Sequence, residues 1–153
     1  MPDDFVDNEE ILYRRVPAGR RLYNYRTDGT IKISSMAFTD REFRVSVDRA
    51  KLCKNNPSFT KGDEPGGVVS LVARDIRSIN ELTRNDPKGK PIQQFKIEVE
   101  SAPLQNNSAH AEIYAIPEFT NADEQGAFHR LCRRLARLAE ARQWEILPPP
   151  DNQ

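Results

Sequence analysis

The sequence predicts an α+β domain in which a mainly antiparallel sheet of five to seven strands carries one long C-terminal amphipathic helix. Several short segments alternate between apolar and polar residues, which is typical of strands with one face in water. One long segment near the C-terminus has helical periodicity instead. Because the strands come first and the long helix last, the pattern favours α+β over a regular alternation of strands and helices.

The clearest strand signals lie in the middle of the chain. Residues 43–48 place Phe43, Val45 and Val47 on one face, and residues 94–100 alternate in the same way. Residues 68–73 are almost wholly apolar, which indicates a strand covered on both faces. The remaining predicted strands are residues 11–16, 31–38 and 109–116.

The predicted long helix spans residues 123–142, with Asn121 as its expected N-cap. A shorter helix is predicted over residues 75–83. The long helix has a single apolar stripe at helical spacing, which consists of Phe128, Leu131, Cys132, Leu135, Leu138 and Ala139.

The domain organisation follows from length and composition. A chain of 153 residues is expected to form one domain over residues 11–147, between a flexible acidic N-terminus (1–10) and a disordered Pro-rich tail (148–153). The first residues do not resemble a signal peptide, and no apolar run is long enough to span a membrane. We therefore expect a cytoplasmic protein without membrane contact.

Charge and cysteine content leave the ligand class open. Lys and Arg together number 23, as do Asp and Glu, so the net charge excludes neither an acidic nor a basic partner. Cys53 and Cys132 lie far apart without neighbouring ligands, so no metal site is predicted. Two buried free thiols are favoured over a disulfide.

An arginine pair lies on the first predicted strand. Because neighbouring strand residues face opposite ways, at most one of Arg14 and Arg15 faces a shared site, and the sequence does not determine which. A guanidinium at a strand end suits a phosphate or carboxylate ligand. The alternative is a solvated arginine that protects a sheet edge.

A pair of serines marks a change in apolar phase between Ile33 and Met36. A β-bulge at this point would aim Ser34 and Ser35 at a phosphate or sugar oxygen. Alternatively, the strand ends early and the serines satisfy backbone groups at the bend.

His110 and Glu112 are the candidate catalytic residues. They share one face of a predicted strand, with side chains about 7 Å apart. The alternative for His110 is an ordinary partly buried histidine. Asp48 is a candidate ligand-binding residue that either orients His110 or an arginine, or caps the following turn, and the cap is favoured.

The predicted long helix is the most basic element. Its polar face is a candidate surface for a protein partner, with nucleic acid a less favoured alternative because no aromatic residues alternate with the arginines. The other interpretation is a solvated helix face. The candidate partner-binding residues are Arg130, Arg133, Arg134 and Arg137.

The chain lacks the sequence signatures of several enzyme classes. It contains no P-loop, no GxGxxG fingerprint, no HExxH and no GxSxG. No cofactor is therefore predicted from local motifs.

Two resemblances concern the same residues. The motifs LxRR (12–15), SSxAFxD (34–40), SVD (46–48) and a late HA (110–111) resemble those of a group of short uncharacterised bacterial proteins. This resemblance implies a bacterial protein in which Arg14, Ser35, Asp48 and His110 form one site. By order along the chain, Arg14, Ser34-Ser35 and Glu112 also resemble the NAD-binding and catalytic positions of ADP-ribosyltransferase-type folds, although no paired-glutamate motif is present.

Two functions are consistent with these observations. The first is a non-catalytic binding or accessory module of a bacterial cytoplasmic system, acting with a protein partner. The alternative is a small, toxin-like transferase that uses a nucleotide or NAD. The transferase requires Arg14, Ser35, His110 and Glu112 to surround one pocket, whereas the accessory module allows them to scatter.

Overall fold

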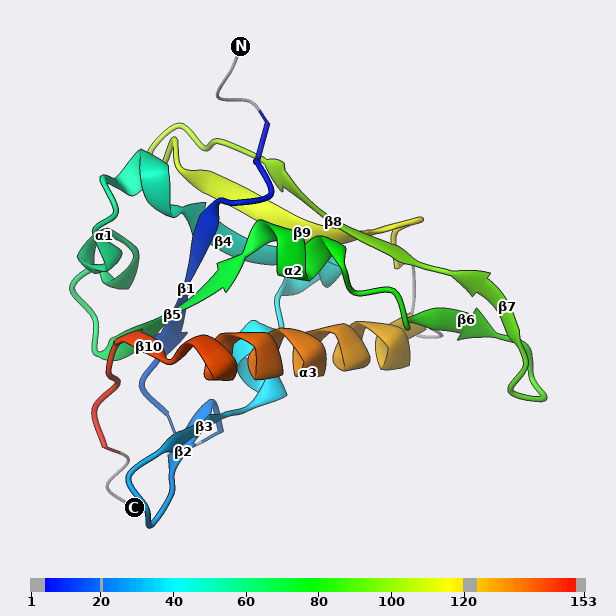
Figure 1. The fold of residues 1–153 in the computed structure, drawn as a ribbon, viewed down its shortest axis with the longest axis horizontal. Coiled ribbons are helices and arrows are strands. Elements are labelled where there is room, and N and C mark those ends of the chain that lie inside the picture. The colour runs from blue at the N-terminus through cyan, green and yellow to red at the C-terminus, as the bar shows by residue number, and fades with distance from the viewer. Residues whose placement is uncertain (1–4, 20, 120–123, 151–153) are drawn as a thin grey trace.

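A computed structural model describes residues 5–19, 21–119 and 124–150. In this part of the chain, six strands form one sheet in the order β10-β5-β1-β4-β9-β8, and neighbouring strands are antiparallel throughout (Figure 1). The predicted α+β class is therefore confirmed. The strands are β1 (Ile11–Pro17), β4 (Val45–Arg49), β5 (Gly66–Val72), β8 (Lys96–Ser101), β9 (His110–Ile116) and β10 (Trp144–Ile146).

The long helix α3 (Gln125–Arg142) crosses one face of the sheet (Figure 1). It buries the predicted apolar stripe, apart from Leu138, which is only partly buried. The expected N-cap Asn121 lies outside the described residues. The stripe packs against inward-facing strand residues such as Val69 and Ile113, so the principal core lies between α3 and the sheet.

The opposite, outer face of the sheet is largely polar. It carries Ser46 and Asp48 of β4, paired across the strands with Glu112 and His110 of β9. One end of this face is covered by the short helix α1 (Pro57–Lys61) and the 3₁₀ turn η4 (Ala50–Cys53), next to a small second core around Tyr13.

Two small hairpins extend from the body. Hairpin β2–β3 (Tyr23–Tyr25 and Ile31–Ile33) lies beside the C-terminal half of α3, where Ile33 N–H donates to Glu140 Oε1 at 3.0 Å (Figure 1). Hairpin β6–β7 (Thr83–Asn85 and Pro91–Gln94) projects from the other end of the molecule.

The Pro-rich segment after β10 contacts hairpin β2–β3. The Tyr25 and Tyr23 hydroxyls donate to the carbonyl oxygens of Pro148 and Pro149, each at 2.6 Å. The described part of the expected disordered tail is therefore held against the body.

The structure differs from the predicted elements at three places. The strand expected over 31–38 ends at Ile33, because Ser34 Oγ accepts a hydrogen bond from Met36 N–H and begins the 3₁₀ helix η2 (Ser35–Phe38). This outcome is the early strand end, in which the serine satisfies the backbone at a bend.

The strand expected from residue 43 begins at Val45, because Glu42 and Phe43 have positive φ angles within the 3₁₀ turn η3 (Arg41–Phe43). The helix expected over 75–83 is shorter, as α2 covers Ala73–Arg77. Ile79 and Leu82 are nevertheless buried, so their spacing reflects core contacts of a non-helical segment.

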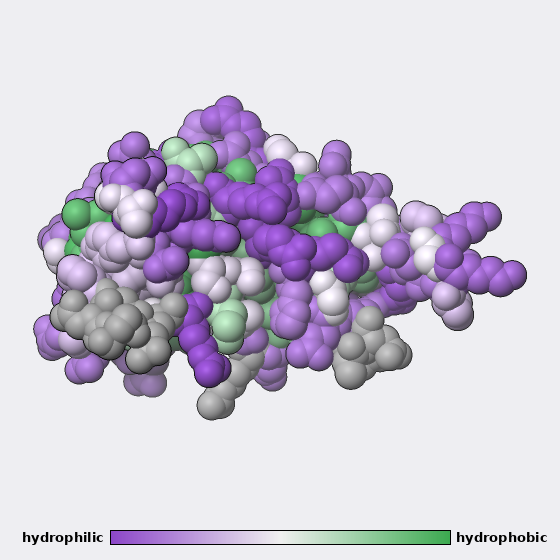
Figure 2. Space-filling view, turned by 90° about the horizontal axis from the view of Figure 1, so that it is seen from below, coloured by the Kyte–Doolittle hydropathy of each residue, from purple (hydrophilic) through white to green (hydrophobic). Residues whose placement is uncertain are grey.

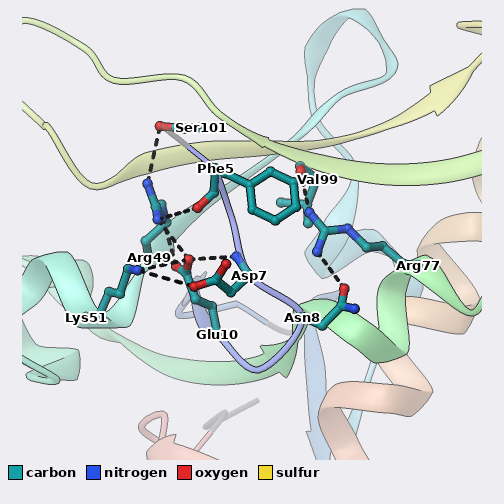
Figure 3. Close-up of polar contacts among 9 residues, drawn as sticks. All are labelled: Phe5, Asp7, Asn8, Glu10, Arg49, Lys51, Arg77, Val99 and Ser101. Atoms are coloured by element: carbon teal, nitrogen blue, oxygen red, sulfur yellow. Dashed lines mark hydrogen bonds and ion pairs between the residues drawn. The ribbon is translucent and has the colours of Figure 1, made fainter. Parts of the chain in front are cut away.

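The N-terminal segment packs on the body at a buried ion pair (Figure 3). Arg49 donates from Nε to Glu10 Oε1 and from Nη2 to Glu10 Oε2, both at 2.8 Å. Arg49 also donates to the carbonyl oxygen of Phe5 at 3.0 Å, and Val6 is buried in the principal core. Residues 5–10, expected as part of a flexible terminus, therefore have specific partners.

Gly67 of β5 permits the close approach of β10. A Cβ atom added to Gly67 would lie 2.6 Å from Ile146 O, 2.8 Å from a Trp144 ring carbon and 2.9 Å from Pro148 N. We expect Gly67→Ala to lower the free energy of unfolding by about 1–3 kcal/mol, as overpacking does elsewhere. Urea unfolding followed by the fluorescence of Trp144, the single tryptophan, measures this change.

Gly19→Ala is the matched control, because nothing lies within 4 Å of its added Cβ atom. Its stability should change by less than about 1 kcal/mol. Equal losses in the two variants would contradict the packing role of Gly67.

Candidate functional site

Arg14 joins β1 to β4 where the two strands separate. Their pairing covers Leu12 opposite Arg49 and Tyr13 opposite Asp48. Beyond it, Arg14 Nη1 donates to the carbonyl oxygen of Ser46 at 2.8 Å and to Asp40 Oδ2 at 3.0 Å.

The same guanidinium also donates from Nε to the Ala37 carbonyl oxygen at 3.1 Å and from Nη2 to that of Thr39 at 3.4 Å. The Arg14 side chain is only 13% exposed. These bonds occupy each of its nitrogens within the chain, so the geometry of Arg14 is that of a structural bridge rather than a ligand-binding group.

Arg15 points to the outer face, as strand alternation requires. Its Nε donates to the Lys61 carbonyl oxygen at 2.9 Å, and Nη2 donates to that of Pro65 at 3.2 Å. Arg15 therefore holds the segment that follows α1 against β1.

Asp48 and His110 belong to a polar network on the outer face. Asp48 accepts from Thr60 Oγ1 at 2.7 Å and from Asn107 Nδ2 at 2.9 Å, rather than capping the turn after β4 as expected. His110 Nδ1 lies 2.8 Å from the Ala102 carbonyl oxygen. Asp48 and His110 line a cavity of about 160 Å³ together with Arg14 and Arg15, and their hydrogen bonds tie α1 and the loop before β9 to the sheet.

Glu112 shares the outer face with His110 but interacts with Arg44. Arg44 Nη1 contacts Glu112 Oε1 at 3.0 Å and Glu100 Oε2 at 2.8 Å, and its Nε and Nη2 bond to Glu118. The hydrogen bonds from Arg44 lower the pKa of Glu118, and those to Glu118 and Glu100 raise the pKa of Arg44. Glu112 is thus part of a surface charge cluster.

The proposed catalytic set does not converge in the described residues. Ser35 lies on the α3 side of the sheet, whereas His110 and Glu112 lie on the outer face. None of the cavities found among the described residues is lined by Arg14, Ser35, His110 and Glu112 together.

Both cysteines are buried free thiols, which agrees with the favoured prediction. Burial raises the pKa of Cys53 to about 11 and that of Cys132 to about 12. A thiol that stays protonated at neutral pH is a poor nucleophile, so neither cysteine has the chemistry of a catalytic residue.

A cleft of about 620 Å³ lies between hairpin β2–β3 and the C-terminal half of α3, and we call it the basic cleft. Seen from below, strongly hydrophilic side chains gather across the middle of the molecular surface (Figure 2). Ser34 and Ser35 line the cleft where β3 ends. Its charged residues are Arg21, Arg26, Lys32, Arg133, Arg137 and Glu140.

The basic cleft contains the arginines that have no partner within the described chain. Arg21, Arg133 and Arg137 are exposed, and among the described residues they make neither a hydrogen bond nor an ion pair through their side chains. The other arginines with described side chains contact a carboxylate, a carbonyl or a hydroxyl oxygen, as Arg134 does with Glu81 at 2.6 Å. The cleft therefore concentrates positive charge that the fold does not neutralise.

Among the described residues, Arg26 is the one cation of the basic cleft whose side chain has partners. Its Nη2 lies 3.3 Å from Glu140 Oε2, and its Nη1 donates to Thr30 Oγ1 at 3.2 Å. Glu140 also accepts from Ile33 N–H, so the same carboxylate fixes hairpin β2–β3 to α3 and sets the width of the cleft.

Comparison with known proteins gives no further guide. No family model, curated protein or solved structure matches this chain. Among the described helices, none combines the length and hydropathy that crossing a membrane requires. Within the same residues, His, Cys, Asp and Glu do not gather into a group of three or more that could hold a metal ion.

The structure divides the predicted basic face of α3. Arg133 and Arg137 line the basic cleft, whereas Arg134 pairs with Glu81. Arg130 lies toward hairpin β6–β7, where its Nη2 is 3.4 Å from the Thr83 carbonyl oxygen and it lines a separate cavity of about 640 Å³.

The half of the basic cleft that hairpin β2–β3 supplies was not predicted from the sequence. Arg21 precedes the hairpin, and Arg26 and Lys32 flank its turn, in which Asp28 Oδ1 accepts from Thr30 N–H and Gly29 adopts a φ of 90°. An Asp-Gly pair between alternating segments is a recognised hairpin signal, so this element was accessible from the sequence.

Proposed function

We propose that this protein is a non-catalytic accessory module that binds an acidic segment of a partner protein in the basic cleft. The observation that carries the proposal is the convergence of Arg21, Arg133 and Arg137, exposed and without partners in the described chain, on one concave surface. A guanidinium presents forked donors that match a carboxylate, so such a surface is suited to an anionic chain.

A protein partner is favoured over nucleic acid by the lining of the cleft. Non-specific binding of single strands relies on exposed aromatic rings on which bases stack. Tyr23 is the aromatic residue among the described residues that line the basic cleft, and it is 2% exposed.

A binding role is favoured over the transferase by the separation of the candidate catalytic residues. Arg14 is engaged with backbone carbonyls, and Glu112 is engaged with Arg44 on the other face of the sheet. A transferase would need these groups around a common substrate.

The test is the binding of a fluorescein-labelled oligo-glutamate peptide, measured by fluorescence anisotropy at low salt. We expect Arg133→Glu/Arg137→Glu to weaken binding by at least about 100-fold, because two charge-assisted hydrogen bonds of about 1.5–3 kcal/mol each are lost. Both residues are exposed, so thermal unfolding of the variant should match that of the wild type.

The matched control is Lys88→Glu/Lys90→Glu, which makes the same change in net charge on the projecting hairpin β6–β7. Its affinity should change by less than about threefold if the cleft is the site, since distant exposed charges are largely screened. Equal losses in the two variants, or binding only to a single-stranded oligonucleotide of matched charge, would contradict the proposal.

A further inference from the structure

We propose that the basic cleft contains a phosphomonoester subsite, so that its preferred ligand carries a phosphate group rather than carboxylates alone. This inference rests on the proposed binding function and specifies the ligand of the same site. It follows from the surplus of positive charge in the cleft and from the neutral donors beside it.

The charge of the basic cleft exceeds what one carboxylate neutralises. Five positive residues and one negative residue line it, which leaves a net charge of +4. Glu140 is already used, because it pairs with Arg26 and accepts from Ile33 N–H. A phosphomonoester brings a charge of about −1.5 to −2 and three strong acceptor oxygens to a single point, whereas a carboxylate brings one charge.

The arrangement of Arg133 and Arg137 suits a multivalent oxyanion. They are four residues apart on α3, which places them about one helical turn apart on the same side of the helix. Two forks on one helix face can share the oxygens of one phosphate, while Arg21 and Lys32 approach from hairpin β2–β3 across the cleft.

The serines add neutral donors to the same cleft. Ser35 makes no side-chain hydrogen bond among the described residues, and both serines are only partly exposed. Ser34 Oγ accepts from Met36 N–H at 3.1 Å, so its own proton is available to a ligand oxygen. Hydroxyl donors beside guanidinium groups are typical partners of phosphate oxygens.

The experiment compares three acidic peptides of identical sequence that differ only in a central serine, glutamate or phosphoserine. We expect the phosphoserine peptide to bind about tenfold more tightly than the glutamate peptide, as an additional charge-assisted hydrogen bond would provide. Equal affinities for these two peptides would overturn the phosphate subsite but leave the proposed function intact. Failure of all three to bind would overturn both.

Arg133→Lys/Arg137→Lys separates phosphate recognition from general charge. This variant retains both positive charges but lacks the forked donors, so it should weaken phosphoserine-peptide binding more than glutamate-peptide binding and thereby reduce the preference for phosphoserine. Ser35→Ala should reduce that preference without altering the affinity for the glutamate peptide. A preference unchanged in both variants would place the phosphate elsewhere and overturn the assignment.

Competition by adenosine monophosphate identifies the source of the phosphate. Displacement of the phosphopeptide by the nucleotide at a similar concentration would support a subsite for phosphomonoesters in general, including small ligands. Displacement only at much higher concentration would support a phosphorylated protein segment as the ligand.

Discussion

Arg49→Ala will lower the free energy of unfolding by about 3–5 kcal/mol, the usual cost of removing one member of a buried ion pair. The side chain of Arg49 is 0% exposed and that of Glu10 is 5% exposed. Without the guanidinium, the Glu10 carboxylate remains buried with one backbone donor, Asp7 N–H at 2.9 Å, and a partly exposed Lys51. Urea unfolding of the variant measures the loss.

Lys51→Ala is the control at the same cluster (Figure 3). Lys51 Nζ lies 3.4 Å from Glu10 Oε2 and 3.8 Å from Asp7 Oδ2, and its side chain is 40% exposed. Its loss should cost no more than about 1 kcal/mol, as for other exposed ion pairs. A comparable loss in both variants would mean that burial does not set the contribution of Arg49.

The double variant Glu10→Leu/Arg49→Met tests whether the unpaired Glu10 carboxylate causes the loss of stability in Arg49→Ala. Replacing both members of a buried pair by apolar residues is often neutral, so the double variant should be more stable than Arg49→Ala. If it is no more stable than that single variant, the packing around the pair, rather than the orphaned carboxylate, accounts for the loss.

The same pair makes stability depend on pH in the acid range. Burial alone would raise the pKa of Glu10, but hydrogen bonds from Arg49 and from Asp7 N–H outweigh it and keep that pKa below its ordinary value of 4.5. The contribution of the pair is therefore complete above pH 4.5 and is lost as the pH falls through the lower pKa of the folded state. Arg49→Ala should lack this part of the acid destabilisation.

Arg14→Ala will lower the free energy of unfolding by about 3–5 kcal/mol, because partly buried carbonyl acceptors that lose their donors cost about 1–3 kcal/mol each and the ion pair with the exposed Asp40 adds to the loss. The carbonyl oxygens of Ala37 and Ser46 and the carboxylate of Asp40 would lose hydrogen bonds at 2.8–3.1 Å. The hydrogen bonds by which Arg14 spans the gap between β1 and β4 would then be lost. Thermal and urea unfolding measure the effect.

Arg15→Ala is the matched control on the neighbouring residue. Arg15 donates to two carbonyl oxygens at 2.9 and 3.2 Å near the end of α1, where solvent can replace it. The expected loss is about 1 kcal/mol. If Arg14→Ala unfolds no more easily than Arg15→Ala yet binds the acidic peptides poorly, Arg14 is a ligand-binding residue after all.

The parts of the fold that could be predicted are those in which the periodicity within one strand or helix shows which of its faces is buried. The alternation over residues 94–100 puts Ile97 and Val99 on one face, and both are buried, as are the alternating Ala111 and Ile113 of the strand predicted over 109–116. The apolar stripe of α3 did the same at helical spacing.

The apolar pattern predicted the backbone conformation less well where a turn signal interrupts an apolar segment. Ile31, Ile33, Ala37 and Phe38 are all buried, yet a turn capped by Ser34 separates them into a strand and a 3₁₀ helix. Ile79 and Leu82 are buried as predicted, but they lie beyond the end of helix α2. Burial was thus predicted better than backbone conformation, because a buried position can be reached by more than one local structure.

By itself, the sequence determined the α+β class, the faces of the main strands and the basic character of α3. Only the tertiary structure decided that Arg133 and Arg137 face hairpin β2–β3, through a hydrogen bond between Ile33 and Glu140, which are 107 residues apart. It also decided that Arg14 bridges two strands while Glu112 meets Arg44 on the opposite face. Periodicity reports which side of an element is apolar, whereas the partner of each polar side depends on how distant elements pack.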